Sequence, residues 1–410
     1  MKALVLAGGF PQIELIKQLK ARGIETILAD YYEEPVAKKY ADKHYQVSTL
    51  DTDAIRQVAI DEKVDFLITV CTDQALNTIA RVSEDLGLPC YIDYKTALNV
   101  TNKQYMKKVF VENGISTARH IILGEFDESA IEGFSYPLIV KPVDCNSSKG
   151  VKKCENIEQL KAAFADAVRF SRTNTAIIEN FVEGPELSID VYVENGKANV
   201  LCVSNNDKIA DKDKFVIFRG RCPAKEGAPV LHLIEKTAQQ IADAFGIKNS
   251  PMLIQLITDG KQVYVLEFSA RTGGGTKFLR INRMTGFDVI KAVIDLTLGE
   301  KPHYEKQDKK QKYLVDDFIY CKPGVFDHLS GFEELKAEGL ITDYYLFKWK
   351  GATFDKIASS GDRIAGFTVM AESVEELRRK HSRATARMQV IDADGQDMMR
   401  HDLITEIADM

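Results

Sequence analysis

The sequence predicts an α/β protein with a Rossmann-like N-terminal domain, a central domain and a small α+β C-terminal domain. Three observations support this fold class. Strands alternate with a helix at the start, four spaced motifs with strand-like cores occupy the middle third, and strands precede a capped helix in the last hundred residues. A chain of 410 residues is long enough for two or three domains. We expect the domains to span residues 1–100, 101–304 and 305–410.

The first hundred residues begin as strand, helix and strand. We expect strands at 2–6, 24–29, 66–70 and 89–92, and a helix at 11–21 in which Pro11 occupies the first turn. Cys71-Thr72-Asp73 follows the carboxyl end of the third strand, where open parallel sheets bind ligands. This tripeptide is either a substrate contact or a plain turn.

The glycine pair after the first strand allows an alternative function for this region. Asp30 follows Gly8 and Gly9 by about 20 residues, as in a dinucleotide-binding fold. However, Gly8-Gly9-Phe10-Pro11 lacks the G-x-G-x-x-G spacing. We therefore favour a tight turn at the ligand side of the sheet over a nicotinamide-dependent oxidoreductase.

In the middle third, a buried strand delivers a lysine to a short polar loop. The apolar run 138–140 leads into Lys141 and Pro142, and the loop 146–150 (NSSKG) ends in Gly150. Backbone N–H groups of such a loop can approach phosphate oxygens closely, and Lys149 adds positive charge. The alternative for Lys141 is a side chain whose stem lies along apolar surface while its ammonium faces water. The alternative for residues 146–150 is an ordinary hairpin turn. The loop is no Walker A motif, because the G-x-x-x-x-G-K-[ST] spacing is absent.

A second strand-like segment, 176–181, breaks at Glu183-Gly184-Pro185. A strand that stops beside a flat ligand leaves main-chain N–H and C=O groups for a purine edge, and Glu186 then lies in reach of ribose hydroxyls. The alternative is that Glu179 and Glu186 simply face water.

Two strand-like runs, 251–257 and 261–268, form a hairpin whose loop length sets the register. A two-residue Asp-Gly turn pairs residue 255 with 264 and places Gln255 and Glu267 on opposite faces. A three-residue loop with a left-handed Gly260 pairs 255 with 263 and places them on one face. We predict the second register, in which their backbones lie about four strand steps apart, on the order of 13 Å.

The second strand of this hairpin carries a carboxylate and a guanidinium suited to phosphoryl chemistry. Glu267, near the end of a hydrophobic strand, suits Mg²⁺, which binds through one or two carboxylates and the phosphates of the substrate. Arg271 precedes three glycines, where a fixed guanidinium can hold a phosphoryl group or a substrate carboxylate bidentately. A surface ion pair is the alternative for Arg271.

Together with Thr101-Asn102-Lys103, these motifs resemble the ATP-grasp superfamily, specifically its carboxylate–amine ligase branch. The resemblance covers residues 1–300 in order and spacing, and the rest loosely. It implies a two-lobed central domain, in which Lys103 and Lys141 are the two nucleotide lysines, residues 179–182 are the adenine hinge, and Glu186 holds the ribose. The implied nucleotide-binding residues are Lys103, Lys141, Ser147, Ser148, Lys149, Gly150, Glu179, Asn180, Phe181, Val182 and Glu186.

The resemblance also implies a metal site, with two departures from the pattern of the superfamily. That pattern is a carboxylate and, twelve positions later, the start of E-x-N-x-R. This chain reads Gln255, Glu267, Ser269 and Arg271 at those positions. Glutamine replaces the first acid and serine replaces the asparagine. These two departures affect positions of the metal motif, so the resemblance leaves open whether a second metal ion binds and how tightly. Glu267 and Arg271 argue against a wholly inactive site.

Composition excludes several classes of protein. A formal net charge of −6 gives no basic surface for nucleic acid. The seven cysteines form no C-x-x-C pair and indicate reduced thiols. The N-terminus begins directly with a strand and no apolar run approaches ~18 residues, so we expect no signal peptide, no membrane span and a cytoplasmic location.

The last hundred residues contain signals of a separate unit. The charged stretch 305–310 indicates a solvated linker, strands are expected near 313–320, 343–349 and 364–371, and Ser373 with Glu376 forms a capping box for the last helix. Gly361-Asp362-Arg363 resembles a turn that ligase C-terminal domains place near the active site; a plain turn is equally compatible.

These observations predict an ATP-dependent ligase. It forms an acyl phosphate from a small carboxylate and then an amide with an amine or amino acid, using ATP and Mg²⁺, with Mn²⁺ as a substitute, and releasing ADP and phosphate. Lys141 and Arg271 are the expected catalytic residues. The expected partners are the small-molecule carboxylate and amine substrates, and the sequence is compatible with a homodimer. The alternatives are a bicarbonate-activating carboxylase or carbamoyl-phosphate-type enzyme, and a nucleotide-binding protein with weakened catalysis. No general base is evident in the sequence.

Overall fold

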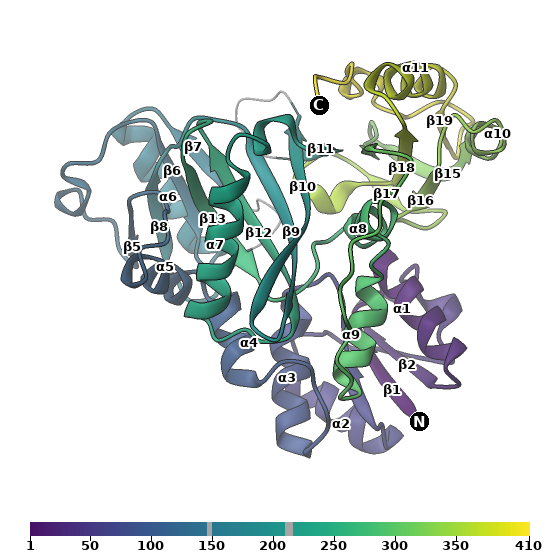
Figure 1. Ribbon diagram of the computed structural model, residues 1–410, viewed down its shortest axis with the longest axis horizontal. Helices are drawn as coiled ribbons and strands as arrows, with labels where there is room; N and C mark the ends of the chain where they lie inside the picture. Colours follow the sequence, from purple (N-terminus) through teal and green to yellow (C-terminus); the bar gives the residue numbers. More distant parts are fainter. Residues whose placement is uncertain (146–149, 210–215) are drawn as a thin grey trace.

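The chain folds into four β-sheets covered by helices, in a computed structural model that describes residues 1–145, 150–209 and 216–410 (Figure 1). Within those ranges no helix is both long and apolar enough to cross a membrane. The mixed α/β fold class is confirmed.

The N-terminal sheet is parallel and has the order β3-β2-β1-β4. Its elements are β1 (Lys2–Leu6), β2 (Glu25–Asp30), β3 (Lys43–Gln46) and β4 (Phe66–Ile68), with helices α1 (Phe10–Ala21), α2 (Thr52–Glu62) and α3 (Gln74–Leu86). The strand predicted at 89–92 is wrong, because these residues form no strand. Ile92 instead lies in the core beneath the sheet, and a short buried apolar run has the same pattern whether or not it is a strand.

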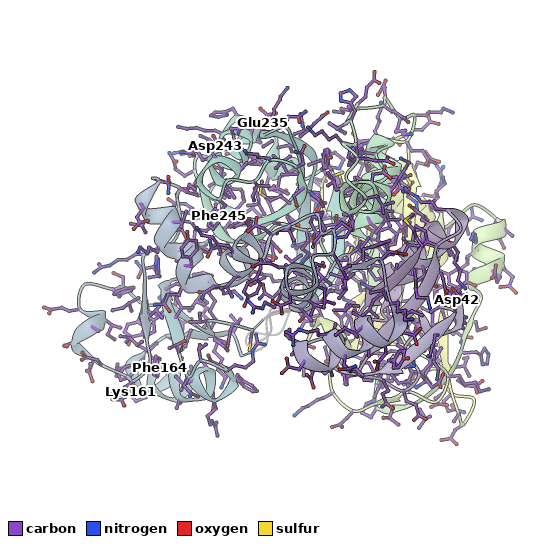
Figure 2. All side chains as sticks on the ribbon, turned by 90° about the horizontal axis from the view of Figure 1, so that it is seen from below. Asp42, Lys161, Phe164, Glu235, Asp243 and Phe245 are labelled. Atoms are coloured by element: carbon purple, nitrogen blue, oxygen red, sulfur yellow. The ribbon has the colours of Figure 1, made fainter. Side chains whose placement is uncertain are left out.

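The small lobe of the central region is an antiparallel sheet of order β5-β8-β6-β7. It contains β5 (His120–Leu123), β6 (Leu138–Pro142), β7 (Lys152–Cys154) and β8 (Ala176–Asn180), and it follows α4 (Tyr94–Thr101) and α5 (Lys103–Glu112). Helix α6 (Ile157–Phe170) covers one face through Leu160, Ala163, Phe164 and Ala167, at helical spacing. In Figure 2, Lys161 and Phe164 of this helix lie at the opposite end of the molecule from Asp42.

The large sheet has eight strands in the order β13-β12-β9-β10-β11-β14-β18-β16. They are β9 (Glu186–Glu194), β10 (Lys197–Lys208), β11 (Ile217–Cys222), β12 (Ser250–Thr258), β13 (Val263–Ser269), β14 (Tyr313–Ile319), β16 (Asp343–Leu346) and β18 (Ala365–Ala371). Strand β14 pairs with β11, so this sheet runs across the boundary predicted at residue 304. The three domain spans stay predictions.

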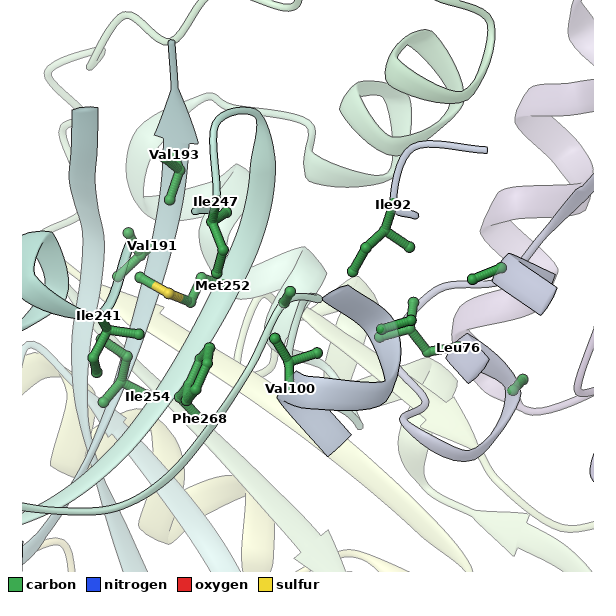
Figure 3. Packing of buried hydrophobic residues seen from close by; sticks show 14 of the residues in the cluster. Leu76, Ile92, Val100, Val191, Val193, Ile241, Ile247, Met252, Ile254 and Phe268 are labelled. Atoms are coloured by element: carbon green, nitrogen blue, oxygen red, sulfur yellow. The ribbon is translucent and has the colours of Figure 1, made fainter. Parts of the chain in front are cut away.

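Strand β9 alternates between an apolar and a polar face. Leu187, Ile189, Val191 and Val193 belong to a core cluster with helix α7 (Leu231–Ala244), and Figure 3 shows Ile241 of α7 beside Val191 and Ile254. Residues 186, 188 and 190 therefore point to the opposite face. That polar face lies toward α8 (Lys277–Thr285), which is followed by α9 (Val289–Thr297).

The same core cluster joins the N-terminal sheet to the large sheet. It contains Leu4 and Leu76 from the first sheet and its helices, Val100 from α4, and Ile254 and Phe268 from β12 and β13. Figure 3 shows Val100 on α4 between Leu76 and Phe268. The N-terminal unit is thus packed firmly against the elements that carry Gln255 and Glu267.

The C-terminal segment adds a three-stranded sheet of β15 (Gly324–Ser330), β17 (Thr353–Phe354) and β19 (Gln389–Asp392), with α10 (Phe332–Ala337) and α11 (Val374–Thr385). The Ser373 side chain caps α11 by accepting from the Glu376 amide, as predicted. The Glu376 carboxylate accepts from the amide of Glu372 and not from that of Ser373. Short 3₁₀ helices lie at 38–40, 129–131, 225–227, 360–362 and 401–403.

Candidate active site

A cavity of about 380 Å³ lies between the small lobe and the polar face of the large sheet. It brings together predicted site residues that are far apart in the sequence: Lys103, Lys141, Glu179, Asn180, Phe181, Val182, Glu186, Gln255 and Glu267. Apolar side chains complete the walls, including Ile139, Val151, Ile257 and Leu266. A concave space with a largely apolar lining and a few convergent charges has the character of a small-molecule site.

Part of the predicted phosphate loop lies outside the described residues, namely Ser147, Ser148 and Lys149. Gly150, which ends this loop, has φ +75°, a left-handed conformation. A Cβ there would lie 2.9 Å from the Pro142 ring, so the position requires glycine for both reasons.

A buried ion cluster fixes Lys141 at the cavity wall. The Lys141 ammonium lies 2.5 Å from the carboxylate of Glu179, and the Lys107 ammonium lies 2.7 Å from it. Burial opposes the charge on Glu179, but the two ammonium groups outweigh burial and hold its pKa at about 2. The alternative that Glu179 faces water is wrong, because only 2% of the residue is exposed.

Sequence reasoning missed Lys107. It lies four residues after Lys103 on α5, and this spacing places both side chains on one face of the helix. Burial lowers the pKa of Lys107 to about 8 despite its contact with Glu179. The spacing of Lys103 and Lys107, four residues apart just before the small lobe, is the sequence signal that could have identified Lys107.

The predicted adenine hinge crosses from β8 to β9. The amides of Asn180 and Phe181 already donate to the carbonyls of Arg119 and Pro137. Among the described residues, the Val182 amide is the one in this hinge without a partner. Gly184 has φ +146°, and a Cβ there would lie 2.1 Å from the Thr258 carbonyl oxygen, so the hinge lies directly against β12.

Glu186 begins β9 and lies in a polar network along the cavity wall. Its carboxylate is 2.5 Å from the Lys208 ammonium and accepts from the side-chain amides of Asn206 and Gln255 at 3.1 Å each. Sequence reasoning did not find Asn206 and Lys208. Both lie on β10, two residues apart and on the same face. The available signal was the alternation of polar residues at the end of this largely apolar strand.

The hairpin of β12 and β13 corrects the predicted register. Thr258 pairs with Val263 across a four-residue loop, and a bulge between Gln255 and Leu256 places Gln255 directly opposite Glu267. Both registers considered from the sequence are therefore wrong. The loop is wider because the Asp259 carboxylate accepts from the amides of Lys261 and Gln262.

The expectation that Gln255 and Glu267 lie on one face is nevertheless confirmed, while metal binding by these residues stays a prediction. Gln255 and Glu267 share a face, and they are direct cross-strand neighbours instead of lying four strand steps apart. Glu267 also lies 3.2 Å from the Lys103 ammonium. One carboxylate and one amide at a cavity wall fit Mg²⁺ that also takes phosphate oxygens. Among the described residues no three His, Cys, Asp or Glu side chains gather around a metal site.

Arg271 and Ser269 meet a carboxylate from the N-terminal unit. The Arg271 guanidinium makes a bidentate pair with Asp73, and the Ser269 hydroxyl donates to the same carboxylate at 2.5 Å. Burial opposes the charge on Asp73, but Arg271 outweighs burial and holds its pKa below the ordinary value. A cavity of about 30 Å³ between these side chains shares Gln255, Glu267 and Lys103 with the larger cavity.

This geometry decides between the alternatives given for Arg271 and Asp73. Arg271 is in an ion pair, but the pair is buried in the site and not on the surface. Asp73, for which a plain turn was the alternative, lies at that site. Ser269 as a metal ligand stays a prediction, and in this structure its hydroxyl is bonded to Asp73.

Comparison with known proteins agrees with this architecture. Residues 134–278 match the family described as the ATP-grasp domain. The central part of this chain is an ATP-grasp domain. The chain is 27% identical to the phosphoribosylamine–glycine ligase of Streptococcus pneumoniae over 304 residues, which cover 68% of this chain and 69% of that protein.

Solved structures share the fold over nearly the whole chain. The L-amino acid ligase of Bacillus licheniformis aligns with a TM-score of 0.78 at 21% identity, covering 96% of this chain and 99% of that one. The biotin carboxylase domain of the 2-oxoglutarate carboxylase of Hydrogenobacter thermophilus, determined with MgADP and bicarbonate, aligns with a TM-score of 0.80 at 18% identity over 98% of this chain and 92% of that one. The fold shared with these structures therefore extends beyond residues 134–278 to the flanking units.

The position of Gln255 predicts how a charge change alters metal dependence. Because Gln255 lies opposite Glu267, Gln255→Glu adds a second carboxylate and is expected to lower the Mg²⁺ concentration needed for half-maximal ADP formation, while Glu267→Gln nearly abolishes turnover. A Mg²⁺ titration measures this directly, with the exposed Gln57→Glu as the control. An unchanged midpoint in Gln255→Glu would remove residue 255 from the metal site.

Proposed function

We propose that this chain is an ATP-dependent carboxylate–amine ligase that makes an acyl phosphate and then an amide, with release of ADP and phosphate. The observation that carries the proposal is one continuous polar wall: Lys103 and Lys141 face the larger cavity, Glu267 and Gln255 lie where the two cavities meet, and Arg271 lines the smaller one. Phosphoryl transfer needs mainly positioning and charge neutralisation, which this wall supplies.

Each residue has a distinct task in this proposal. The ammonium of Lys141, fixed by Glu179, contacts phosphate oxygens, and Lys103 exchanges its contact with Glu267 for the same phosphates. Mg²⁺ held by Glu267 and Gln255 with the phosphates would neutralise the charge on the transferring group. The Arg271 guanidinium orients the substrate carboxylate so that one of its oxygens attacks phosphorus and forms the acyl phosphate.

The second half-reaction follows at the same carbonyl carbon. The neutral amine nitrogen attacks, the C–O bond to phosphate breaks, and phosphate leaves with the bonding electrons and takes up the proton that the nitrogen loses as the amide forms. The larger cavity, of about 380 Å³, has a size that suits small-molecule substrates. All seven cysteines are free thiols, which supports the cytoplasm as the compartment.

The geometry after β1 disfavours the oxidoreductase alternative. The Asp30 carboxylate, the candidate ribose contact, accepts from the Gly8 amide at 2.6 Å. A Cβ on Gly8 would lie 2.5 Å from Pro35, so the space beside the glycine turn is filled by the protein itself. A dinucleotide pyrophosphate needs that space.

The experiment that tests the proposal is a screen for ADP release. Each of the twenty protein amino acids is offered alone and in pairs with MgATP, with bicarbonate as a separate arm. We expect ADP formation that requires both a carboxylate and an amine. ADP formation with bicarbonate alone would favour the carboxylase alternative, and no turnover with intact MgATP binding would favour the nucleotide-binding protein.

A further inference from the structure

The polar face of β9 continues beyond the nucleotide cavity to a buried carboxylate. Glu186, Ser188 and Asp190 follow one another at every second residue, so Asp190 lies on the order of 13 Å along the strand from Glu186. Asp190 is 1% exposed, and neither of its carboxylate oxygens has a hydrogen-bond partner among the described residues. Leaving a buried carboxylate without partners costs folding free energy, so its retention points to a ligand.

A lysine without an acidic partner lies opposite this carboxylate. Lys277, at the start of α8, donates to the Ser188 hydroxyl and forms no ion pair within the described part of the chain. Gly273 permits this position, because a Cβ there would lie 2.2 Å from the Lys277 side chain. Burial raises the pKa of Asp190, and burial lowers the pKa of Lys277 to about 8.

The other charges near Asp190 are already matched. Arg271 is paired with Asp73, and the Arg280 guanidinium lies 2.8 Å from the Asp316 carboxylate. What remains is one carboxylate and one ammonium, which influence each other electrostatically but form no ion pair with each other among the described residues. A ligand that carries both an ammonium and a carboxylate would satisfy the two groups at once.

This place in the fold lies next to the smaller cavity. Leu253, the neighbour of Asp190 on β12, lines the smaller cavity together with Asp73 and Arg271. The cavity of about 30 Å³ has room for roughly one water molecule. A larger ligand therefore reaches Asp190 only when the Asp73–Arg271 pair separates.

We propose that Asp190 and Lys277 form the subsite for the amine substrate, and that this substrate is a zwitterionic amino acid whose ammonium contacts Asp190 and whose carboxylate contacts Lys277. The proposal rests on the proposed ligase function of the same site. The ammonium gives one proton to the Asp190 carboxylate, and the resulting amine nitrogen attacks from the end of the β9 polar face farther from Glu186. The proposal also assigns Arg271 to the other substrate, because Lys277 holds the carboxylate of this one.

Calorimetry with MgADP present tests the subsite. The probes are the twenty protein amino acids and, for each that binds, the matching amine without its carboxylate. We expect at least one amino acid to bind at least 10-fold more tightly than its amine, and Asp190→Asn and Lys277→Met each to weaken it at least 10-fold. MgADP affinity should stay within a factor of two in both variants, and Lys291→Met, on exposed surface, is the matched control.

Thermal unfolding distinguishes this role from a structural one. Asp190→Asn removes an unpartnered buried charge and is expected to raise the melting temperature of the ligand-free protein while it loses amino-acid binding. The proposal is overturned if amines bind as tightly as amino acids, if both variants keep parental amino-acid affinity, or if Asp190 holds only water and its replacement changes melting alone. Failure of the parent to bind MgADP would instead contradict the proposed function.

Discussion

Glu179→Gln is expected to lower the free energy of unfolding by about 3–5 kcal/mol at pH 7, the usual cost of leaving a buried charge unpaired. The Glu179 carboxylate is the shared partner of Lys107 and Lys141, and Lys107 is 1% exposed, so its ammonium loses its counter-charge without gaining water. Urea unfolding followed by circular dichroism measures the difference. Glu183→Gln, an exposed neighbour in the hinge, is the matched control.

The pH dependence of that difference has a definite sign. The pKa of Glu179 is held at about 2 in the folded protein, below its ordinary value of 4.5. A depressed carboxyl pKa contributes stability that is fully present above pH 4.5 and is lost as the pH falls through about 2. The gap between parent and Glu179→Gln should therefore be constant between pH 4.5 and about pH 7, below the pKa of Lys107 at about 8, and should narrow below pH 4.5. A gap that stays constant down to pH 2.5 would contradict the role of the ion cluster.

Lys141→Ala and Arg271→Ala are each expected to slow ADP formation by roughly 10²-fold or more, the scale of removing one electrostatic stabiliser. Both side chains line the cavities, and both are held in ion pairs that fix their positions. Steady-state kinetics at saturating MgATP measures the effect, below the melting temperature of each variant because each substitution also removes one partner from a buried carboxylate. Lys108→Ala, on the exposed face of α5, serves as control.

The two variants should differ in which kinetic constant changes. Arg271→Ala is expected to raise the KM for the carboxylate substrate as well as lower kcat, whereas Lys141→Ala leaves that KM near the parental value. Turnover within threefold of the parent in either variant would exclude that residue from the transfer step.

Much of this site could be predicted because its residues lie at strand ends and in motifs with a fixed spacing. Lys141 at the end of β6, Glu186 at the start of β9 and Glu267 on β13 all reach one cavity, as expected. Their local sequence places each at a strand or loop position, and the resemblance to a known superfamily supplies the order in which such elements assemble.

The rest depends on long-range geometry that the local sequence does not contain. The register of β12 and β13 depends on a bulge beside Gln255 and on Asp259 widening the loop. The contact of Asp73 with Arg271 joins residues 198 positions apart. Asp190 reads as an ordinary polar residue in an alternating strand, and only its missing partners distinguish it.

The most direct measurement of the central claim follows oxygen from the carboxylate substrate. A carboxylate–amine pair that supports ADP release is used with ¹⁸O in the carboxylate, and the released inorganic phosphate is analysed by mass spectrometry. If an acyl phosphate forms, one carboxylate oxygen stays on phosphorus when the amine breaks the C–O bond, so each phosphate carries one ¹⁸O. Phosphate without ¹⁸O, with all label retained in the amide or the unreacted acid, would contradict the ligase mechanism.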